Sequence, residues 1–362
     1  MNLVFINKVY RILKRKADAF VGSFFSLEKT LEEMSLRPYE LHLEFTNLCN
    51  AKCIFCPYQF QTRKVEFMTD DVFYKSVSDF CSIGGGTVGL TPIVGDALID
   101  PKFLERVKFL RAQYQIDRIN LTTNGILLDK FGIEEVLNSG LTSIVISTAG
   151  FEEEMYERVY RSSSYERMRK NVLELVECNS KKKDPLNITI GLRSDRSLEE
   201  VLKDKDFQPI LAYNPQIDFT WSFTSANGRI TREMLPEIMK LRVVKNRNEP
   251  CVNTFNGPIV LPDGTVMACS CVAAMDAVND LGIGNILESS LLDIWKSQKI
   301  KDIRSSFGTN CLNKTCAGCD MYREPELYRT FEGRERAKIN HQRLKGQVVF
   351  RKSKPFEPFP GG

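Results

Sequence analysis

Residues 39–56 read YELHLEFTNLCNAKCIFC and join a strand-like run to three clustered cysteines. The first seven residues are rich in β-forming side chains and predict a strand that leads directly into a loop. The loop places Cys49, Cys53 and Cys56 at the spacing C-x3-C-x2-C. Three thiolates this close can hold one cubic iron-sulfur cluster and leave its fourth iron open to another ligand. A zinc ion would need a fourth protein ligand, and the loop contains neither a histidine nor a further cysteine.

The chain around this loop repeats one pattern, in which a β-rich run and a loop precede a helical run with apolar residues at spacings of three and four. The predicted strands cover residues 39–45, 87–91, 118–123, 143–148, 187–193 and 216–223. The predicted helices between them cover residues 69–80, 101–114, 133–140 and 165–177. Six β/α units in series predict an α/β fold with a parallel sheet, either open or closed into a barrel. Its functional residues should lie on loops at the carboxyl ends of the strands.

Composition is that of a folded globular protein, with 43% hydrophobic and 27% charged residues among 362. Fifty basic and 46 acidic side chains leave a net charge of +4, so no nucleic-acid partner is expected. With only His42 and His341, the chain is not expected to build a His-rich metal site or a His-centred triad. The N-terminus lacks the features of a secretory signal, and no segment has the apolar length of a membrane span. We therefore expect a cytoplasmic protein whose eleven cysteines serve metal binding rather than disulfides.

Six of the eleven cysteines lie between residues 251 and 319, in a turn-rich segment with little apolar periodicity. A segment with so small an apolar core needs a further stabilising link, and a metal centre can supply one. Four of these cysteines are divided two and two and can complete a closed four-thiolate cluster: Cys251, Cys269, Cys316 and Cys319. Zinc accepts the same ligands, so the spacing leaves the metal open.

The loop after the first strand resembles that of radical S-adenosylmethionine (SAM) enzymes, which carry C-x3-C-x-aromatic-C at this place, and Phe55 occupies the aromatic position. The resemblance covers about residues 39–320 and implies a partial (β/α)6 TIM-like barrel with a SAM-binding [4Fe-4S] cluster. It also implies that SAM chelates the open iron. An electron from the cluster then splits SAM into methionine and a 5′-deoxyadenosyl radical, which removes a hydrogen atom from the substrate.

Two further motifs resemble the family's cofactor loops at the ends of the second and third strands. Gly95 and Asp96 match the loop that binds the SAM amino group, although Asp96 replaces a glutamate and Val94 replaces a glycine. Thr123 and Asn124 belong to a turn similar to the family's Thr-Asn-Gly turn beside the cofactor.

The later strand ends carry further candidates. Ser147 stands where the family has a serine that contacts SAM, but the aspartate that usually follows is absent. Arg193 ends the fifth strand and either binds the SAM carboxylate as a fork, faces the substrate in a catalytic role or forms a surface salt bridge. Trp221 and residues 227–229 follow the sixth strand and either contact adenine or substrate or, as we favour for Trp221, pack in the core.

The second cysteine-rich part, with PDGTVMAC and GNILESSLLDIW between its cysteines, resembles the Twitch/SPASM domain that follows some radical SAM barrels. The resemblance implies one auxiliary [4Fe-4S] cluster on the four cysteines divided two and two. Cys271 and Cys311 remain, and two thiols cannot hold another cubane. Either of them is a substitute ligand, or Cys271 is a catalytic thiol that donates a hydrogen atom to a substrate radical, or a small buried residue.

Four parts of the chain are expected. Residues 1–36 form a helical extension, 37–228 the radical SAM barrel, 229–325 a connector with the auxiliary-cluster domain, and 326–362 a basic tail. The start of the connector, residues 229–250, is expected to be helical, and the last stretch of the tail disordered.

The N-terminal extension is amphipathic. Such a helix either packs against the barrel, as we favour, or contacts a membrane surface peripherally. Its apolar face consists of Leu3, Ile6, Tyr10, Leu13 and Ala17.

The expected activity is that of a radical SAM oxidoreductase or epimerase acting on a small polar substrate of the sugar, aminocyclitol or nucleoside type. An external one-electron reductant such as flavodoxin or ferredoxin would serve the cluster. Peptide maturation, by a thioether or carbon-carbon crosslink or by epimerisation, is the alternative. We rank it second because 38 residues before the first strand are too few for an independently folded leader-binding domain. A non-catalytic iron-sulfur scaffold or sensor is the alternative of another class.

Overall fold

The structure, a computed structural model, describes residues 26–90 and 93–346. Its strands are β1 Glu40–Leu43, β2 Gly86–Leu90, β3 Ile116–Thr123, β4 Ser143–Thr148, β5 Asn187–Leu192, β6 Gln216–Phe219, β7 Ser222–Phe223, β8 Lys240–Leu241, β9 Ile259–Val260, β10 Thr265–Met267 and β11 Gly282–Asn285.

Helices follow or separate most of these strands. The α-helices are α2 Leu27–Ser35, α3 Asp70–Ser82, α4 Phe103–Ala112, α5 Ile133–Leu137, α6 Glu153–Tyr160, α7 Tyr165–Ser180, α8 Leu198–Val201, α9 Gln208–Leu211, α10 Asn253–Asn256, α11 Val278–Leu281, α12 Leu291–Trp295, α13 Gln298–Ser305, α14 Lys314–Gly318 and α15 Phe331–Leu344. Short 3-10 helices lie at Pro57–Phe60, Ala97–Ile99, Leu128–Lys130, Lys205–Phe207, Arg232–Met234, Val272–Ala274 and Pro325–Arg329.

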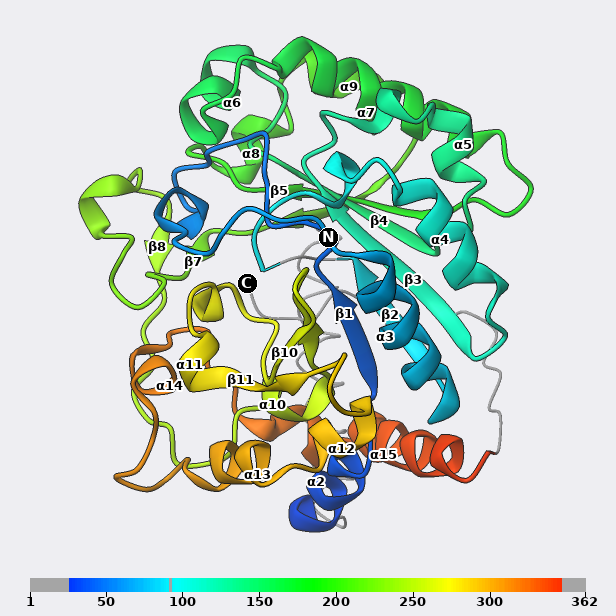
Figure 1. The fold of residues 1–362 in the computed structure, drawn as a ribbon. Coiled ribbons are helices and arrows are strands. Elements are labelled where there is room, and N and C mark those ends of the chain that lie inside the picture. The colour runs from blue at the N-terminus through cyan, green and yellow to red at the C-terminus, as the bar shows by residue number, and fades with distance from the viewer. Residues whose placement is uncertain (1–25, 91–92, 347–362) are drawn as a thin grey trace.

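One nine-stranded sheet runs through the molecule in the order β11-β10-β9-β1-β2-β3-β4-β5-β6 (Figure 1). Strands β1 to β6 are parallel, and each pairs with the next in the sequence. The predicted parallel α/β sheet is therefore confirmed. The sixth strand is shorter than predicted because β6 ends at Phe219, and residues 222–223 form β7, which pairs with β8.

Local sequence explains where the helices begin. Thr69 precedes α3, and its hydroxyl accepts the N–H of Val72 at 3.3 Å, while Asp70 and Asp71 occupy the first turn. A side-chain cap and acidic residues both stabilise a helix N-terminus, because they satisfy or face its unpaired N–H groups. The buried face of α3 carries apolar residues such as Phe73, which belong to the hydrophobic core.

The auxiliary region extends the sheet of the barrel. Strand β9 pairs in parallel with β1, with Ile259 opposite His42 and Val260 opposite Leu43, and β10 and β11 add antiparallel strands. A continuous apolar core joins both parts. The boundary predicted at residue 229 remains a prediction, but the two parts share one sheet.

The connector differs from its prediction. Residues 229–250 run mostly as extended chain with a 3-10 turn and the short β8, instead of forming a helix. Besides hydrogen bonds within its own turns, this chain pairs with other segments, as when the N–H of Lys240 donates to the carbonyl of Trp221 at 2.8 Å. Tertiary pairing has replaced the local propensity.

The predicted basic tail also differs, because residues 331–344 form α15, which packs beside α2 below the barrel (Figure 1). The buried Arg37 donates to Asn340 at 2.9 Å and to the carbonyl of Gly85, so it ties α15 to the loop before β2. Arg343 reaches Asp117 of β3 at 2.7 Å. The disorder expected at the end of the tail and the apolar face expected in residues 1–25 lie outside the described residues.

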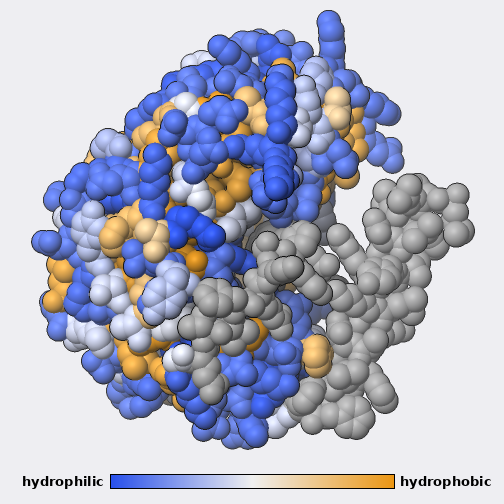
Figure 2. Space-filling view, turned by 90° about the vertical axis from the view of Figure 1, so that its right-hand side faces the viewer, coloured by the Kyte–Doolittle hydropathy of each residue, from blue (hydrophilic) through white to orange (hydrophobic). Residues whose placement is uncertain are grey.

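On the face shown in Figure 2, hydrophobic side chains lie scattered among hydrophilic ones. None of the described helices is both long and apolar enough to cross a membrane.

Candidate functional site

The cysteine loop, residues 47–56, leaves β1 and is held against the end of α6. The N–H of Lys52 donates to the carbonyl of Tyr160 at 3.1 Å, and the N–H of Ile54 donates to that of Val159 at 2.9 Å. These two hydrogen bonds fix the middle of the loop. Its partly buried thiols are those of Cys49, Cys53 and Cys56.

The three thiols lie close enough to raise one another's pKa values. Burial raises the pKa of Cys49 to about 12, and Asp96 and Cys56 add to the shift. Burial also raises the pKa of Cys53 well above its usual range, and Cys56 and Cys49 contribute next. The thiols therefore keep their protons in the metal-free protein, and stabilising three thiolates here requires a positively charged centre.

The loop after β2 crosses the cysteine loop at Gly95. This residue has a φ of +100°, and a Cβ there would lie 2.5 Å from the carbonyl oxygen of Thr46. The next N–H, that of Asp96, donates to the carbonyl of Leu48 at 2.9 Å. Glycine is required here because the two backbones approach so closely. The predicted Gly95 and Asp96 thus lie beside the cysteines.

The carboxylate of Asp96 joins the ends of β2 and β3. It accepts the N–H of Leu98 at 3.0 Å, the hydroxyl of Thr123 at 2.8 Å and the N–H of Asn124 at 2.9 Å. Asp96 is buried, and burial raises its pKa while these three donors lower it. An ionised carboxylate has about four acceptor positions, so one position remains for a further donor.

Asn124 faces the cysteine loop directly. Its amide nitrogen donates to the side-chain oxygen of Asn50 at 2.7 Å and lies 4.0 Å from the sulfur of Cys49. The N–H of Ile126 donates back to its amide oxygen at 3.0 Å, which fixes the orientation of the group. The predicted Thr123 and Asn124 are therefore brought to the same place as the predicted Gly95.

An aromatic layer connects the cysteine loop with the end of β4. The hydroxyls of Ser147 and Tyr160 share a hydrogen bond of 2.7 Å. Phe55 packs edge-on against Tyr160 with ring centroids 5.6 Å apart, and against Phe223 at 5.1 Å. The predicted Ser147 and Phe55 thus meet through Tyr160, which the sequence analysis did not single out.

Arg193, at the end of β5, also faces the cysteines. Its N–H donates to the carbonyl of Thr148 at 2.8 Å, and its guanidinium donates to the carbonyl of Gly191 at 3.0 Å. Its positive charge lowers the pKa of both Cys53 and Cys56 against the larger effect of burial. A surface salt bridge, one of the alternatives for Arg193, is not the arrangement found.

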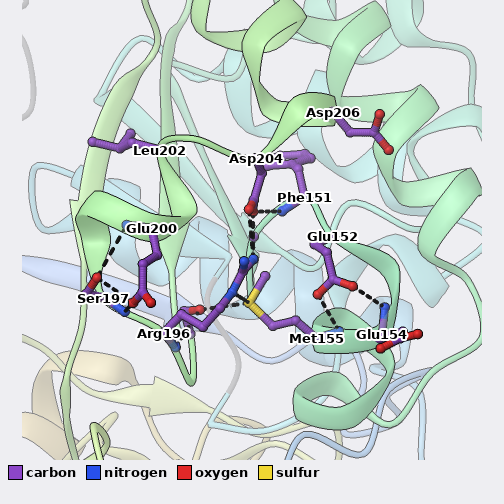
Figure 3. Close-up of polar contacts among 12 residues, drawn as sticks. Phe151, Glu152, Glu154, Met155, Arg196, Ser197, Glu200, Leu202, Asp204 and Asp206 are labelled. Carbon is purple, nitrogen blue, oxygen red and sulfur yellow. Dashed lines mark hydrogen bonds and ion pairs between the residues drawn. The ribbon is translucent and has the colours of Figure 1, made fainter.

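A partly buried ion pair joins the segments after β4 and β5 (Figure 3). Arg196 donates to both carboxylate oxygens of Asp204, at 2.8 and 2.9 Å, and Asp204 accepts the N–H of Phe151 at 3.3 Å. Met155 lies beside the pair, where its sulfur accepts from Arg196 at 3.3 Å. The segments that follow β4 and β5, next to Ser147 and Arg193, are therefore fixed to each other.

Residues 61–67 fold back over β1 and are held by side chains that the sequence analysis missed. Glu44 is fully buried and accepts two hydrogen bonds from Arg63, at 2.6 and 3.1 Å. Asn47 donates to the carbonyl of Lys64 at 2.7 Å. The available signal was a glutamate at the end of the first predicted strand, directly before the cysteine loop, because a buried carboxylate needs a cationic partner.

The second cysteine centre draws its thiols from separated segments. Backbone N–H groups already point at two of the sulfurs: Arg323 donates to Cys251 at 3.5 Å, and Cys271 donates to Cys269 at 3.3 Å. The remaining two predicted ligands lie on and just after α14, at Cys316 and Cys319.

The effects of these thiols on one another's pKa values indicate that several of them lie close together. The pKa of Cys319 is raised, first by a hydrogen bond with Cys271 and then by burial. Burial raises the pKa of Cys251 to about 11, and the thiols of Cys319 and Cys316 contribute to the shift. The structure thus places the buried Cys271 beside Cys319, whereas Cys311 is exposed.

Neither centre resembles a site for a single ion. Within residues 26–90 and 93–346, no three Cys, His, Asp or Glu side chains form a group that could hold one metal ion. Zinc needs its ligands at about 2.3 Å around one point, whereas each cysteine of a cubane bonds a different iron. Cysteine thiolates are the ligands of [4Fe-4S] clusters, so the donor chemistry of both centres suits such clusters.

The residues after β6 lie at the rim of the site. Trp221 is 49% exposed, so the predicted core packing is wrong. Strand β6 ends at Phe219, two residues before Trp221, so the strand does not direct the Trp221 ring into the core. Residues 227–229 are exposed on the same rim.

A parallel β/α sheet whose strand ends meet three cysteines, followed by a second cysteine centre, defines a two-centre iron-sulfur enzyme. The chain belongs to the radical SAM superfamily, whose family model matches residues 43–204, and it carries a SPASM iron-sulfur cluster-binding domain at residues 251–320. Membership implies [4Fe-4S] clusters and SAM as the cofactors.

Curated relatives include GTP 3′,8-cyclases. That of Mannheimia succiniciproducens is 24% identical over 63% of this chain and 70% of its own length. That of Clostridium perfringens strain SM101 is 30% identical over 49% of this chain and 53% of its own length. The match thus spans about half of the second relative.

Solved structures share the fold. Streptococcus suis SuiB bound to S-adenosylmethionine has a TM-score of 0.54 at 14% identity, over 83% of this chain and 76% of that one. The enzyme anSMEcpe, with bound AdoMet and the Cp18Cys peptide, has a TM-score of 0.52 at 15% identity, over 86% and 96% of the two chains.

Proposed function

We propose that this chain removes a hydrogen atom from a small polar substrate of the sugar, aminocyclitol or nucleoside type, and so dehydrogenates or epimerises it. The observation that carries the proposal is that the ends of β2 to β5 all meet the cysteine loop, with the amide of Asn124 4.0 Å from the sulfur of Cys49. In this chemistry the reduced cluster splits bound SAM to give the radical that abstracts hydrogen.

The cysteine loop would hold the SAM-binding cluster. Cys49, Cys53 and Cys56 are buried thiols with raised pKa values, so they would release their protons as iron binds. The amide of Asn124 would donate toward the sulfur of Cys49 and orient it, as outer partners orient metal ligands.

The loops around the cysteines would bind SAM. Carbonyls beside Gly95 and the one unused acceptor position of Asp96 suit the SAM ammonium group, and Thr123 holds Asp96 in place. Arg193 would present its guanidinium to a carboxylate, of SAM or of the substrate. Phe55 and Ser147 would close the side of the site, because both contact Tyr160.

The auxiliary centre would hold the second cluster through the four cysteines predicted as ligands, and Cys271 would serve as a fifth thiol. Because Cys271 already contacts Cys319, it is either a substitute ligand or a hydrogen-atom donor for epimerisation. A Cys271→Ser variant separates these roles. Loss of cluster absorbance indicates a ligand, whereas an intact cluster with loss of solvent-derived hydrogen in an inverted product indicates a donor.

The relatives support a nucleoside-like substrate, because GTP in their name is a nucleotide. Peptide modification is the alternative. We further propose that a flavodoxin or ferredoxin supplies the electron, and that the chain works in the cytoplasm, where reduced thiols can take up iron.

The test is anaerobic reconstitution, followed by iron and sulfide counting and a 5′-deoxyadenosine assay with SAM and dithionite. We expect about eight irons per chain and formation of 5′-deoxyadenosine. Two filled clusters without any deoxyadenosine would instead identify an iron-sulfur scaffold or sensor. If deoxyadenosine forms, substrate screening with nucleosides, aminocyclitols and peptides then decides between the two substrate classes.

A further inference from the structure

A strained turn lies between the two cysteine centres. Residues 224–229, here called the rim turn, follow β7, and three successive members have left-handed backbone: Ala226 with φ 50°, Asn227 with φ 58° and Gly228 with φ 82°. Two of these are not glycine, and such a conformation persists only where surrounding contacts impose it. The contacts that impose it should therefore matter to the site.

One set of contacts comes from the auxiliary C-x2-C segment. Asp320, the residue after Cys319, accepts the hydroxyl of Thr224 and, at 2.5 Å, the N–H of Ser225. A Cβ at Gly318 would lie 3.0 Å from the side-chain oxygen of Asn227. The start of the rim turn is thus seated directly on the auxiliary centre.

A second aspartate joins the rim turn to the other centre. Asp276 follows the loop that carries Cys271, and its side chain is 8% exposed. One carboxylate oxygen accepts Arg229 of the rim turn at 2.7 Å, and the other accepts the N–H of Thr62 at 3.1 Å. Thr62 lies six residues after Cys56 and next to Arg63, which is paired with the buried Glu44.

We propose that Asp276 is a positioning residue that couples the two cysteine centres, because its carboxylate holds the segment after the SAM-cluster cysteines and the rim turn at once. Binding at the cysteine loop would then be transmitted through Thr62 and Asp276 to the rim turn, and the auxiliary loop would reciprocally restrain the cysteine loop. The consequence concerns the region between the centres, where residues 227–229 are exposed. The inference rests on the proposed function only in assuming that SAM binds at the cysteine loop.

The test compares amide hydrogen exchange in the reconstituted full-length holoprotein, with and without SAM, for wild type, Asp276→Asn and Arg229→Gln. In wild type, SAM should slow exchange at residues 49–62 and also at residues 224–230. In Asp276→Asn we expect local protection near the cysteines to persist and protection of the rim turn to disappear. Exchange at Thr62 without SAM should rise roughly fivefold, the change expected for one weakened hydrogen bond.

Arg229→Gln removes the other arm and keeps the bond to Thr62. It should therefore free the rim turn without accelerating exchange at Thr62, and it serves as the second variant if Asp276→Asn fails to fold. The matched control is Glu33→Gln, which breaks the 2.6 Å ion pair with Arg334 between α2 and α15 and leaves the contacts of Asp276 in place. That control should leave the response to SAM unchanged.

Protection of the rim turn by SAM that survives in both Asp276→Asn and Arg229→Gln would overturn the proposal. So would a wild type in which the rim turn does not respond to SAM while residues 49–62 do. Failure of the proposed function shows differently, as absence of 5′-deoxyadenosine. If SAM did not bind at all, the exchange rates of the SAM-free variants at Thr62 would still decide whether Asp276 holds the two segments together.

Discussion

The two cysteine centres are built in opposite ways. The first takes its three thiols from eight consecutive residues in one loop, and backbone hydrogen bonds to α6 and to the β2 loop hold that loop in place. The second takes its thiols from three segments that are distant in sequence, at residue 251, residues 269–271 and residues 316–319. The first centre is therefore a local feature of one loop of the barrel, whereas the second links segments that are distant in the sequence. Loss of the first cluster should consequently abolish the chemistry, whereas loss of the second should destabilise the fold.

The largest expected effect is on SAM cleavage. Replacing Cys53 by Ala should reduce 5′-deoxyadenosine formation to the rate without enzyme, because the cluster loses one of its three ligands. Replacing Cys319 by Ala should leave some cleavage but yield no product. Quantifying 5′-deoxyadenosine and product together tests the contrast, and equal loss of cleavage in both variants would contradict it.

A second large effect concerns thermal stability. The double variant Cys316→Ala and Cys319→Ala should lower the anaerobic Tm clearly more than Cys53→Ala and Cys56→Ala does, because metal bound by distant segments contributes folding free energy. Calorimetry of four reconstituted proteins measures this difference. They are wild type, the two double variants and Cys311→Ser, which serves as a control at an exposed thiol. Equal Tm shifts for the two double variants would show that both centres stabilise the fold alike.

The segment after the cysteine loop offers a third test, in which stability depends on pH. Arg63→Gln leaves the buried Glu44 without its cationic partner, although the N–H of Ile93 still donates to it at 3.1 Å, and should cost about 3–5 kcal/mol of unfolding free energy near neutral pH. Burial raises the pKa of Glu44, so the folded state keeps a proton that the unfolded state has already lost. The unfolding free energy should therefore fall as the pH rises through the window above the ordinary carboxyl pKa.

Urea unfolding of the metal-free protein at about pH 5 and about pH 8 measures this dependence. The control is Arg167→Gln, which removes a 2.9 Å ion pair with Asp129 between side chains that are 46% and 43% exposed, and should cost only about 0–1 kcal/mol. A loss in Arg63→Gln that is equally small at both pH values would show that Glu44 does not depend on Arg63.

The smallest expected effect is at the aromatic layer. Tyr160→Phe removes the hydrogen bond to Ser147 but keeps the ring that packs on Phe55. We expect about 1 kcal/mol, or about fivefold, weaker SAM binding with an unchanged fold. Equilibrium binding of SAM measures it, and Ser147→Ala should give a similar loss if the hydrogen bond itself is responsible.

The sequence predicted the barrel well because its evidence is local and repeated. Strands such as Ser143–Thr148 were predicted at their observed bounds, since a β-rich run between turns needs no tertiary information. The cysteine loop and the glycine at residue 95 were equally visible, because metal spacing and close backbone approach both leave a mark in the sequence.

What the sequence did not predict depends on partners distant in the chain. Asp276 lies 214 residues from Thr62, and Glu44 lies 19 residues from Arg63, so neither contact has a local pattern. Trp221 was expected in the core because its size favours burial, but the early end of β6 leaves it at the rim. The connector was expected to be helical, and its pairing with β7 made it extended instead.

The pairing of β9 with β1 has a consequence for biosynthesis. β1 lies between β2 and β9. The N–H groups of His42 in β1 and of Glu44 just after it donate to the carbonyls of Pro258 and Val260, each at 3.0 Å. While the ribosome is still making the middle of the chain, that side of β1 is therefore an open edge, ready to pair with another chain. A fragment ending near residue 228 would keep this edge permanently and should aggregate. During synthesis, β1 therefore pairs on one side only until the last third of the chain has been made. In that interval iron can reach the cysteine loop that follows β1.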